Sequence, residues 1–358
     1  MGHSRGGIVL AAGGTGGHLF PAQALAKELL SQGKEVILLT DGRGGTFQDK
    51  ALKTLILPMG SFQGSWRAKV KGMGRMLQGI FVSFHHLHCL KPSVVVGFGG
   101  YGSFPPLVAA ILLRIPIVIH QADAYLGRVN RLLAPFARVI ATSFPHVEKI
   151  PRHAKVTLTG LPLRPEIQPA DYQSVKTKGP IYLLVTGGSQ GARVFGEIVP
   201  KAIQLLDPAL QKRLHITQQC RPESLPQTQT LYAVTEASVV LSPFLENMGD
   251  HYRKAQLIIS RAGASSVSEA AFVGRPAIFI PYPHAMDDHQ SYNAREAVGS
   301  EGGWLIQERD LTAQGLATLL SDLINSPWKL ERAAGNIRSI ITPDASERLA
   351  RAVCMLER

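Results

Sequence analysis

The sequence is poor in cysteine and lacks any recognisable metal-binding pattern. Its three cysteines, Cys89, Cys220 and Cys354, lie far apart in a chain of 358 residues, and none has the short ligand spacing of a zinc site. This usage is more typical of a reducing compartment than of a disulfide framework. An Asp-x-Asp motif is also missing. We therefore expect neither a metal nor another cofactor.

Long apolar runs are absent as well. The longest candidate, Leu107–Ile119, is interrupted by Arg114 and Pro116, and it falls short of the roughly 20 apolar residues that cross a bilayer. The run Ile8–Ala12 is far shorter than the apolar core of a signal peptide, and glycines follow it. We expect a protein that stays in the cytoplasm and does not cross a membrane.

Acidic residues are outnumbered by basic ones, 26 against 38, so the formal net charge is +12. This excess favours an anionic partner, which composition leaves open between nucleic acid, an anionic lipid surface and phosphorylated substrates; a solvated basic surface without a partner is the alternative. Hydrophobic residues make up 45% of the chain and glycines number 35, which is typical of a globular α/β protein. The length predicts two domains, each with its own core.

Short apolar runs alternate with helical patterns, and each run predicts a strand of a parallel sheet that helices cover on both faces. The runs lie at residues 7–12, 35–40, 93–99, 115–120, 137–143, 180–186, 215–219, 238–244, 257–263 and 277–283. A helix is predicted around Ala22–Leu30 with its end at Gly33, and another at Ser346–Arg358. The segment 159–170 separates two doubly wound series. We expect their ligand-binding edges to face a common cleft.

Three glycine-rich turns each follow a predicted strand and precede a helix. They read "GGTGGH" at 13–18, "GFGGYGS" at 97–103 and "TGGSQGAR" at 186–193. Glycine lets a ligand approach the backbone closely, and a helix N-terminus attracts anions. The first turn is not a dinucleotide fingerprint, because Leu19 stands where the third glycine belongs, and no Gly-Lys-Ser/Thr follows to make a P-loop. The turns predict substrates with several phosphates; a purely structural role is the alternative.

Five motifs stand in one order along the chain: "GGTGGHLFPA", "GFGGYGSFPP", "GGSQGAR", "SRAGASSVSEAAFVGRPAIFIPYP" and "DDHQSYNA". In residues and spacing they resemble the MurG family of bacterial glycosyltransferases, over essentially the whole chain. The resemblance implies an α/β chain of GT-B fold, with two Rossmann-like parallel-sheet domains facing a cleft. It implies an acceptor and membrane-facing domain at 1–163, a UDP-GlcNAc-binding domain at 164–344, and a C-terminal helix at 345–358 that packs on the first domain.

The reaction implied by the resemblance is an inverting transfer of N-acetylglucosamine (GlcNAc) from UDP-GlcNAc to the 4-hydroxyl of the muramoyl sugar of lipid I. Lipid I is undecaprenyl-diphosphate-linked muramoyl-pentapeptide, and the product is lipid II for peptidoglycan synthesis. The resemblance also implies a peripheral protein on the cytoplasmic face of the cell membrane. Its partners would be an anionic membrane surface and other wall-synthesis enzymes, without nucleic acid.

Donor-site residues carry over from the family one position at a time. Glu269 matches the glutamate that binds both ribose hydroxyls, Ala264–Ser268 would hold the UDP diphosphate through backbone N–H groups, and Ser189 would contact a phosphate. Uracil-side positions fall on Arg164 and the Leu245 main chain, and a sugar-hydroxyl contact falls on Gln290, with His289 beside it a weaker candidate. The implied donor set is Thr15, Gly16, Gly17, Asp123, Arg164, Ser189, Leu245, Ala264, Ser265, Ser266, Val267, Ser268, Glu269 and Gln290.

The acceptor side centres on His18. An inverting transfer needs a base for the acceptor proton and charge stabilisation for the leaving diphosphate, which helix N-termini supply without a metal. Imidazole titrates near neutral pH, and His18 resembles the family's proposed base or acceptor-diphosphate ligand; both roles stay open. The implied acceptor-diphosphate set is Gly14, Thr15, Gly16, Gly17, His18, Gly99, Gly100 and Tyr101.

The chain departs from the family at one functional place. Where the family has His-Glu-Gln-Asn, this sequence has His120, Gln121, Ala122 and Asp123, and Leu161 replaces the Asn of the family's Gly-Asn-Pro. These changes bear on acceptor recognition. Two alternatives therefore stay open: a related enzyme with another lipid acceptor, such as a diacylglycerol galactosyltransferase, and a UDP-sugar-binding scaffold with weakened catalysis.

Residues 65–88 suit a membrane surface. The segment interleaves basic residues with apolar ones, namely Trp66, Met76, Leu77, Ile80, Phe81 and Phe84. Such a pattern is typical of a helix that lies on anionic lipid beside a membrane-held acceptor. The alternative is a helix that packs on the sheet and keeps a solvated basic face.

Overall fold

The structure is a computed structural model that describes residues 6–13, 16–41, 52–58, 66–176, 178–188 and 191–357. The chain divides into two compact units. Met1–Arg164 and Thr342–Arg358 form one, called here the N-terminal unit, and Pro165–Ile341 form the C-terminal unit. The first break therefore falls one residue after the expected domain boundary, and the chain returns to the N-terminal unit three residues earlier than expected.

The N-terminal unit contains a seven-stranded parallel sheet in the order β3-β2-β1-β4-β5-β6-β7. Every residue of β1, β2, β4 and β5 is buried, as expected for parallel strands covered on both faces. The strands are β1 (Ile8–Ala12), β2 (Val36–Thr40), β3 (Lys53–Ile56), β4 (Val94–Gly97), β5 (Ile117–Gln121), β6 (Val139–Thr142) and β7 (Val156–Leu158).

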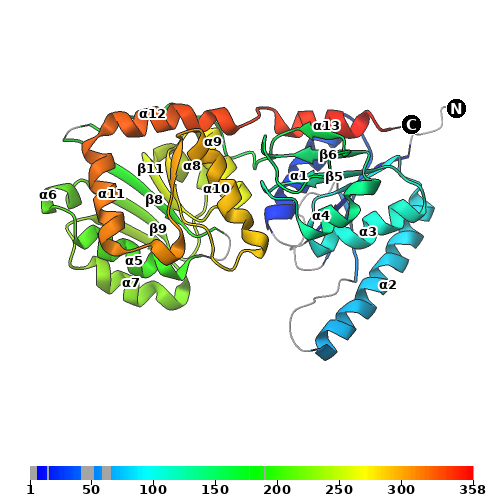
Figure 1. The fold of residues 1–358 in the computed structure, drawn as a ribbon, viewed down its shortest axis with the longest axis horizontal. Helices are drawn as coiled ribbons and strands as arrows, with labels where there is room; N and C mark the ends of the chain where they lie inside the picture. The colour runs from blue at the N-terminus through cyan, green and yellow to red at the C-terminus, as the bar shows by residue number, and fades with distance from the viewer. Residues whose placement is uncertain are drawn as a thin grey trace. The chain divides into compact units, whose positions relative to one another are not determined.

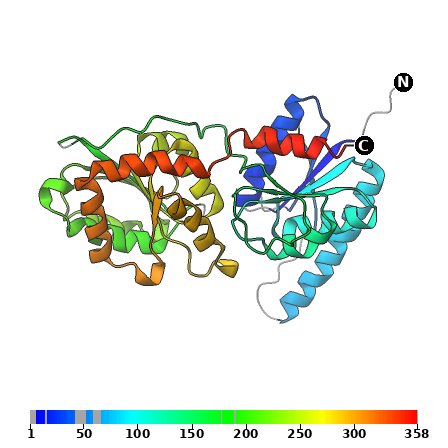
Figure 2. The same cartoon turned by 45° about the horizontal axis from the view of Figure 1, so that its top comes forward.

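Helices cover both faces of this sheet (Figure 1). They are α1 (Gly16–Ser31), α2 (Trp66–Leu90), α3 (Gly100–Leu112), α4 (Arg128–Leu133) and α13 (Ala345–Cys354). Figure 2 shows α13 beside α1, where Leu349 and Val353 join the core of Leu25 and Leu29. The predicted end of α1 is confirmed: Gly33 lies two residues beyond the last helical residue, Ser31, has a φ of 73°, and its N–H donates to the Leu30 carbonyl. The terminal helix ends at Cys354 instead of running to the last residue.

The long helix α2 is confirmed, but two of the apolar residues expected on its outer face, Met76 and Ile80, do not lie there. Met76 is 5% exposed and packs inward, and Ile80 is half-buried. The exposed apolar side chains recur every three or four residues, which places them on one helical face: Val70, Met73, Leu77, Phe81 and Phe84. The Trp66 side chain lies outside the described residues. The sequence reading therefore located the amphipathic helix but misassigned part of its outer face.

The C-terminal unit repeats the architecture with six parallel strands in the order β10-β9-β8-β11-β12-β13. They are β8 (Ile181–Thr186), β9 (Leu214–Gln219), β10 (Ser238–Ser242), β11 (Leu257–Ser260), β12 (Ala277–Phe279) and β13 (Gly303–Leu305). The helices are α5 (Arg193–Gln204), α6 (Pro208–Gln211), α7 (Leu225–Tyr232), α8 (Met248–Lys254), α9 (Ala264–Val273), α10 (His289–Gly299), α11 (Ala313–Asn325) and α12 (Pro327–Ile337). The fold class is thus confirmed: two α/β units, each with a parallel sheet in the doubly wound strand order.

Each of the ten predicted apolar runs overlaps a strand, while β3, β7 and β13 were not predicted. All three are edge strands of three or four residues. Edge strands meet a neighbour on one side only, so their sequences need not be continuously apolar. A run of three residues also carries no measurable periodicity, which is why these strands gave no signal.

Candidate active site

In the N-terminal unit, two glycine turns meet where the strand order reverses. Strands β1 and β4 are paired side by side, although two other strands and two helices separate them in sequence. The turns that follow them come into contact: a Cβ built on Gly102 would lie 2.3 Å from Cα of Gly13. Only glycine permits this approach. Open α/β sheets bind ligands at such reversal points, so the geometry marks this edge as a binding edge.

His18 lies at this reversal point, in the first turn of α1. Its imidazole rests against the second glycine turn: a Cβ built on Gly100 would lie 3.1 Å from His18 Cδ2, and one built on Gly99 would lie 3.4 Å from Cε1. Both glycines have positive φ, 69° and 86°. A Cβ on Gly17 would meet no described atom within 4 Å. The structure therefore places the His18 imidazole beside glycine backbone that no described side chain covers at Gly17.

His120 lies at the carboxyl end of β5, and its side chain is fully buried. Its Nε2 lies 3.5 Å from the Gly160 carbonyl oxygen and 3.4 Å from Ser143 Oγ, and its ring is 5.3 Å from that of Phe98. Burial lowers the pKa of His120 to about 4; the Gly160 hydrogen bond opposes this shift, and the electrostatic interaction with the His18 imidazole adds to it. His120 is consequently a neutral imidazole at neutral pH.

Gln121, which replaces the family's glutamate, organises the loop after β5. Its Nε2 donates to the carbonyl oxygens of Asp123 and Tyr125 at 3.0 and 2.9 Å. Its Oε1 accepts from Gly127 N at 3.2 Å and Asn130 Nδ2 at 2.8 Å. A carboxylate has no N–H to donate to the two carbonyls. The substitution thus belongs to a loop whose hydrogen bonds require an amide.

The C-terminal unit has a second reversal point, between the paired strands β8 and β11. Gln219, from β9, builds the turn after β8: its Oε1 accepts from Thr186 Oγ1 at 3.1 Å and from Gly187 N at 3.2 Å. Gly188 and Gly191 then take positive φ, 75° and 66°. A Cβ on Gly188 would meet no described atom within 4 Å. This turn also exposes its backbone to a ligand.

The turn after β11 leads into α9, whose first residue is Ala264. Gly263 precedes the helix without a side-chain cap, and a Cβ there would meet no described atom within 4 Å. The first intrahelical bond runs from Val267 N to the Gly263 carbonyl, so the preceding N–H groups have no acceptor within the helix. Glu269 follows in the same helix and is 6% exposed. The Ala264–Ser268 segment can therefore present N–H groups to an anion.

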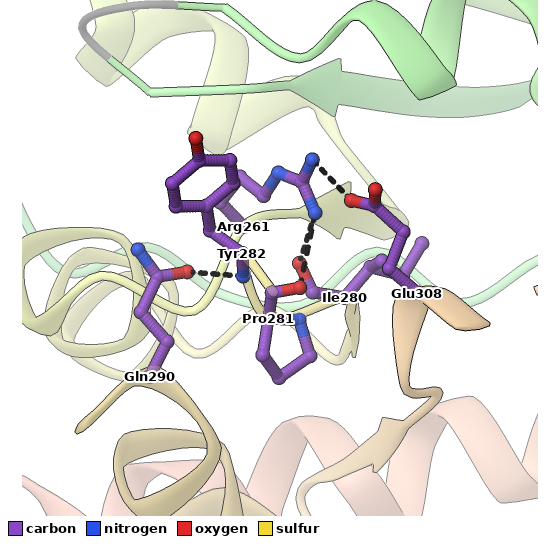
Figure 3. Close-up of polar contacts among 6 residues, drawn as sticks. All are labelled: Arg261, Ile280, Pro281, Tyr282, Gln290 and Glu308. Carbon is purple, nitrogen blue, oxygen red and sulfur yellow. Dashed lines mark hydrogen bonds and ion pairs between the residues drawn. The ribbon is translucent and has the colours of Figure 1, made fainter. Parts of the chain in front are cut away.

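Gln290 lies in the first turn of α10, and its Oε1 accepts a hydrogen bond from Tyr282 N at 2.9 Å (Figure 3). His289 turns back, with Nδ1 2.8 Å from the Met286 carbonyl. The helix is tied to the turn before α9, because Asn293 Nδ2 donates to the Ala262 carbonyl at 3.0 Å. The structure thus joins Gln290 to the same edge of the sheet as Ala264.

The remaining expected site residues belong to both units. Arg164 ends the first segment of the N-terminal unit, and its guanidinium lies 5.4 Å from the Phe20 ring centroid. Leu245 is 7% exposed in the C-terminal unit, and Tyr101 is 41% exposed in the first turn of α3. Asp123 is half-buried in the loop after β5. The expectations for Gly14, Thr15 and Ser189, and for any side-chain contact of Gly16, lie outside the described residues.

Comparison with known families decides the class of protein. Residues 8–142 match the glycosyltransferase family 28 N-terminal domain, and residues 182–349 match the glycosyltransferase family 28 C-terminal domain. The chain belongs to glycosyltransferase family 28. It is therefore a glycosyltransferase, and the two matched segments correspond to the two doubly wound sheets.

Named relatives of this family are similar over nearly the whole chain. Proteins from Rhodospirillum centenum and Rhodospirillum rubrum are each 44% identical to it, over 97% and 96% of this chain and 93% and 90% of their own lengths. Both are named UDP-N-acetylglucosamine--N-acetylmuramyl-(pentapeptide) pyrophosphoryl-undecaprenol N-acetylglucosamine transferase. The expected membership of the MurG family is confirmed.

Solved structures agree with the fold. MurG from Acinetobacter baumannii superposes with a TM-score of 0.80 at 31% identity, covering 98% of this chain and 99% of that one. A UDP-GlcNAc 2-epimerase from Neisseria meningitidis superposes with a TM-score of 0.69 at 15% identity, over 97% of this chain and all of the other. The second likeness shows the shared fold alone.

The two edges support anion chemistry built from backbone N–H groups and imidazole. Among the described residues, no group of three or more His, Cys, Asp or Glu side chains is arranged to hold a metal ion. Sequence reasoning missed Gln219 and Asn130, which shape the turns from neighbouring segments. Their only sequence signal was a polar residue at the end of an apolar strand or in a short helix.

Proposed function

We propose that this glycosyltransferase moves GlcNAc from UDP-GlcNAc to the 4-hydroxyl of the muramoyl sugar of lipid I, with inversion, and so makes lipid II. The observation that carries the proposal is that each sheet has one point of strand-order reversal, and that a glycine turn lies there with its backbone accessible. The chain is also 44% identical to a transferase named for this reaction. Two phosphate-bearing substrates need two such edges.

The C-terminal unit is the proposed donor domain. The uncapped start of α9 supports a role in binding the UDP diphosphate, because its N–H groups and helix dipole favour negative charge. Glu269, five residues further along, is assigned to the ribose hydroxyls. Gln290 is assigned to a sugar hydroxyl: Tyr282 N–H fixes its Oε1, which leaves Nε2 as a donor. Arg164, Ser189, Leu245 and Asp123 remain in the proposed donor set.

The N-terminal unit is the proposed acceptor domain, with His18 at its centre. As the 4-hydroxyl attacks the anomeric carbon, the bond from that carbon to the UDP oxygen breaks and the hydroxyl loses its proton. His18 serves this step either as the base that takes the proton or as a ligand of the acceptor diphosphate. Its position against Gly99 and Gly100 supports both assignments. Tyr101 and the first glycine turn complete the proposed acceptor site.

The exposed face of α2 supports peripheral attachment to an anionic membrane on the side where the substrates lie, the cytoplasmic face. Leu77 and Phe81 are 61% and 75% exposed, and the same helix carries the exposed basic residues Lys71 and Arg75. None of the helices in the described ranges has the length and apolar character to span a bilayer. Other wall-synthesis enzymes on the same membrane are the remaining proposed partners.

Vesicle sedimentation tests the attachment. With vesicles rich in anionic phospholipid, Leu77→Glu and Phe81→Glu should reduce the bound fraction severalfold, because a buried apolar side chain contributes about 1.5–3 kcal/mol. Val234→Glu changes a residue that is 76% exposed in the other unit, and it should bind as the wild type does. Equal binding of all four proteins would contradict the attachment through α2.

A transfer assay tests the reaction. The purified protein is incubated with labelled UDP-GlcNAc and either a short-chain lipid I analogue or a diacylglycerol, and UDP-GlcNAc binding is measured in parallel. We expect labelled product with the lipid I analogue only. Label on the diacylglycerol instead would identify another lipid acceptor, and donor binding without any product would identify a scaffold; each result would overturn the proposal.

A further inference from the structure

We propose that Arg261 and Glu308 form a positioning pair that holds Gln290 in the geometry needed for the donor sugar. The inference rests on the proposed function, which gives Gln290 its ligand, and it adds two residues that contact neither uridine nor diphosphate in that scheme. Figure 3 shows the cluster. The chain of contacts runs from Glu308 to Arg261, from there to the backbone after β12, and from that backbone to Gln290.

Arg261 is a buried cation that binds the backbone of the segment directly after β12. It follows β11 directly, and its side chain is 9% exposed. Its Nη1 donates to the carbonyl oxygens of Ile280 and Pro281 at 3.2 and 3.0 Å. Nη2 forms an ion pair with Glu308 Oε2 at 2.5 Å. A buried guanidinium needs partners of this kind, because an unpaired charge in this place would be costly.

Two aromatic rings fix the direction of the guanidinium. Its central carbon lies 5.1 Å from the Phe195 ring centroid and 5.4 Å from that of Tyr282. Both distances are within the range of a cation–π contact. Tyr282 therefore touches Arg261 through its ring, while the carbonyl before it, that of Pro281, accepts from the same guanidinium. Arg261 thus holds the peptide segment that carries Tyr282 N–H.

That N–H is the group that orients Gln290. Tyr282 N donates to Gln290 Oε1 at 2.9 Å (Figure 3), and this bond fixes which end of the amide faces the strand. Gln290 Nε2 makes no hydrogen bond with the described residues, so it is the end left to donate to a sugar hydroxyl. A displacement of the Pro281–Tyr282 segment would turn this donor away.

The turn that carries Glu308 holds the start of α10 as well. Gln307 Nε2 donates to Ser291 Oγ at 3.0 Å, and Ser291 Oγ donates to Asp288 Oδ1 at 2.7 Å. Asp288 directly precedes α10 and has a positive φ of 53°, a strained conformation that neighbouring contacts must hold. One turn therefore fixes both elements that meet at Gln290: the segment after β12 and the first turn of the helix.

If the pair positions Gln290, its removal should weaken the binding of ligands that carry the sugar and not the binding of UDP alone. Gln290 is assigned to GlcNAc and not to UDP, so a loosened pair should weaken the binding of UDP-GlcNAc and spare that of UDP. Glu308→Ala should weaken UDP-GlcNAc binding about tenfold, the effect of roughly one well-formed hydrogen bond to the ligand, with little change for UDP. Glu308→Gln keeps an oxygen that can accept from Arg261, and it should restore most of the loss.

A double-mutant cycle separates positioning from general damage. If Glu308 acts through Gln290, adding Glu308→Ala to Gln290→Ala should cause no further loss of UDP-GlcNAc affinity. The matched control is Glu301→Ala, which removes another glutamate of this unit that pairs with an arginine, Arg332, but at an exposed site. Equal losses for UDP and UDP-GlcNAc, or additive losses in the double variant, would overturn the proposal.

Hydrogen exchange tests the same pair without a ligand. In Glu308→Ala the Tyr282 amide should exchange about tenfold faster than in the wild type, because its hydrogen bond to Gln290 opens more often; in Glu301→Ala and Glu308→Gln the rate should stay close to that of the wild type. An unchanged rate in Glu308→Ala would overturn the positioning role. If the exchange rates differ as expected but the wild-type protein has no affinity for UDP-GlcNAc, the positioning role stands and the proposed function is contradicted.

Discussion

The imidazole of His18 lies against the α-carbon of Gly100, and the two residues come from turns that follow different strands. A Cβ at position 100 would lie 3.1 Å from the ring, and the φ of 69° there disfavours any side chain. Gly100→Ala should therefore displace the imidazole, cut kcat at least tenfold and cost about 1 kcal/mol of stability. Gly74→Ala, where a Cβ meets no described atom within 4 Å, is the control. Wild-type kcat in Gly100→Ala would contradict the contact.

Replacement of His18 tests its place in the reaction. His18→Ala should lower kcat by a factor of about 10²–10⁴, the usual contribution of a positioned acid–base group, while the affinity for UDP-GlcNAc stays nearly unchanged, because the donor is assigned to the other unit. Steady-state kinetics and donor titration measure the two effects separately. The exposed His153→Ala serves as the control. Unchanged turnover in His18→Ala would remove His18 from the site.

Glu269→Ala should separate donor from acceptor binding. The side chain is 6% exposed in α9 and is assigned to two ribose hydroxyls, and hydrogen bonds to a charged group contribute about 1.5–3 kcal/mol each. We expect UDP-GlcNAc affinity to fall at least tenfold, with little change for the lipid I analogue. Equilibrium titration with each ligand measures this, with the exposed Glu236→Ala as control. Equal losses for both ligands would argue against the ribose assignment.

Gln121→Glu tests whether the amide is required in this chain, although the related family usually has glutamate there. The carboxylate cannot donate to the Asp123 and Tyr125 carbonyls, which Gln121 Nε2 now binds. We expect a loss of about 2 kcal/mol in the free energy of unfolding, from two lost hydrogen bonds, and a higher KM for the acceptor. Urea titration and kinetics measure these effects. A stability equal to that of the wild type would show that the loop rearranges around a carboxylate.

The buried His120 predicts a loss of stability in acid. Its pKa is lowered to about 4 from an ordinary value of 6.5, mainly by burial, so below pH 6.5 the unfolded chain takes up the proton more readily than the folded one. The stabilisation is complete above pH 6.5 and is lost as the pH falls toward 4, by about 3 kcal/mol in total. Urea titration at pH 7.5 and pH 5 should show about 2 kcal/mol of this loss.

The variant His120→Gln tests whether His120 causes this loss of stability in acid. In His120→Gln the difference in unfolding free energy between pH 7.5 and pH 5 should shrink by about 2 kcal/mol, whereas in the exposed His153→Gln it should equal that of the wild type. If His120→Gln keeps the full pH dependence, another group carries it.

Much of the fold was predictable because buried parallel strands are continuous apolar runs. The strands that carry the turns, β1, β4, β8 and β11, all lie within runs read from the sequence. The edge strands β3, β7 and β13 were missed because they are only three or four residues long and pair with a neighbour on one side only. In the site, His18 and the glycine turns gave a local signal, whereas Arg261 and Glu308 are 47 residues apart in sequence and meet only in the folded unit.

The most direct test of the central claim is the structure of the reaction product. The protein is incubated with UDP-GlcNAc and a short-chain lipid I analogue, the product is isolated, and its glycosidic linkage and anomeric configuration are determined by NMR. The account predicts GlcNAc joined to the muramoyl 4-hydroxyl in β configuration, inverted from the α configuration of the donor. A product with the α configuration, a linkage to another hydroxyl, or no disaccharide despite measurable UDP-GlcNAc binding would contradict it.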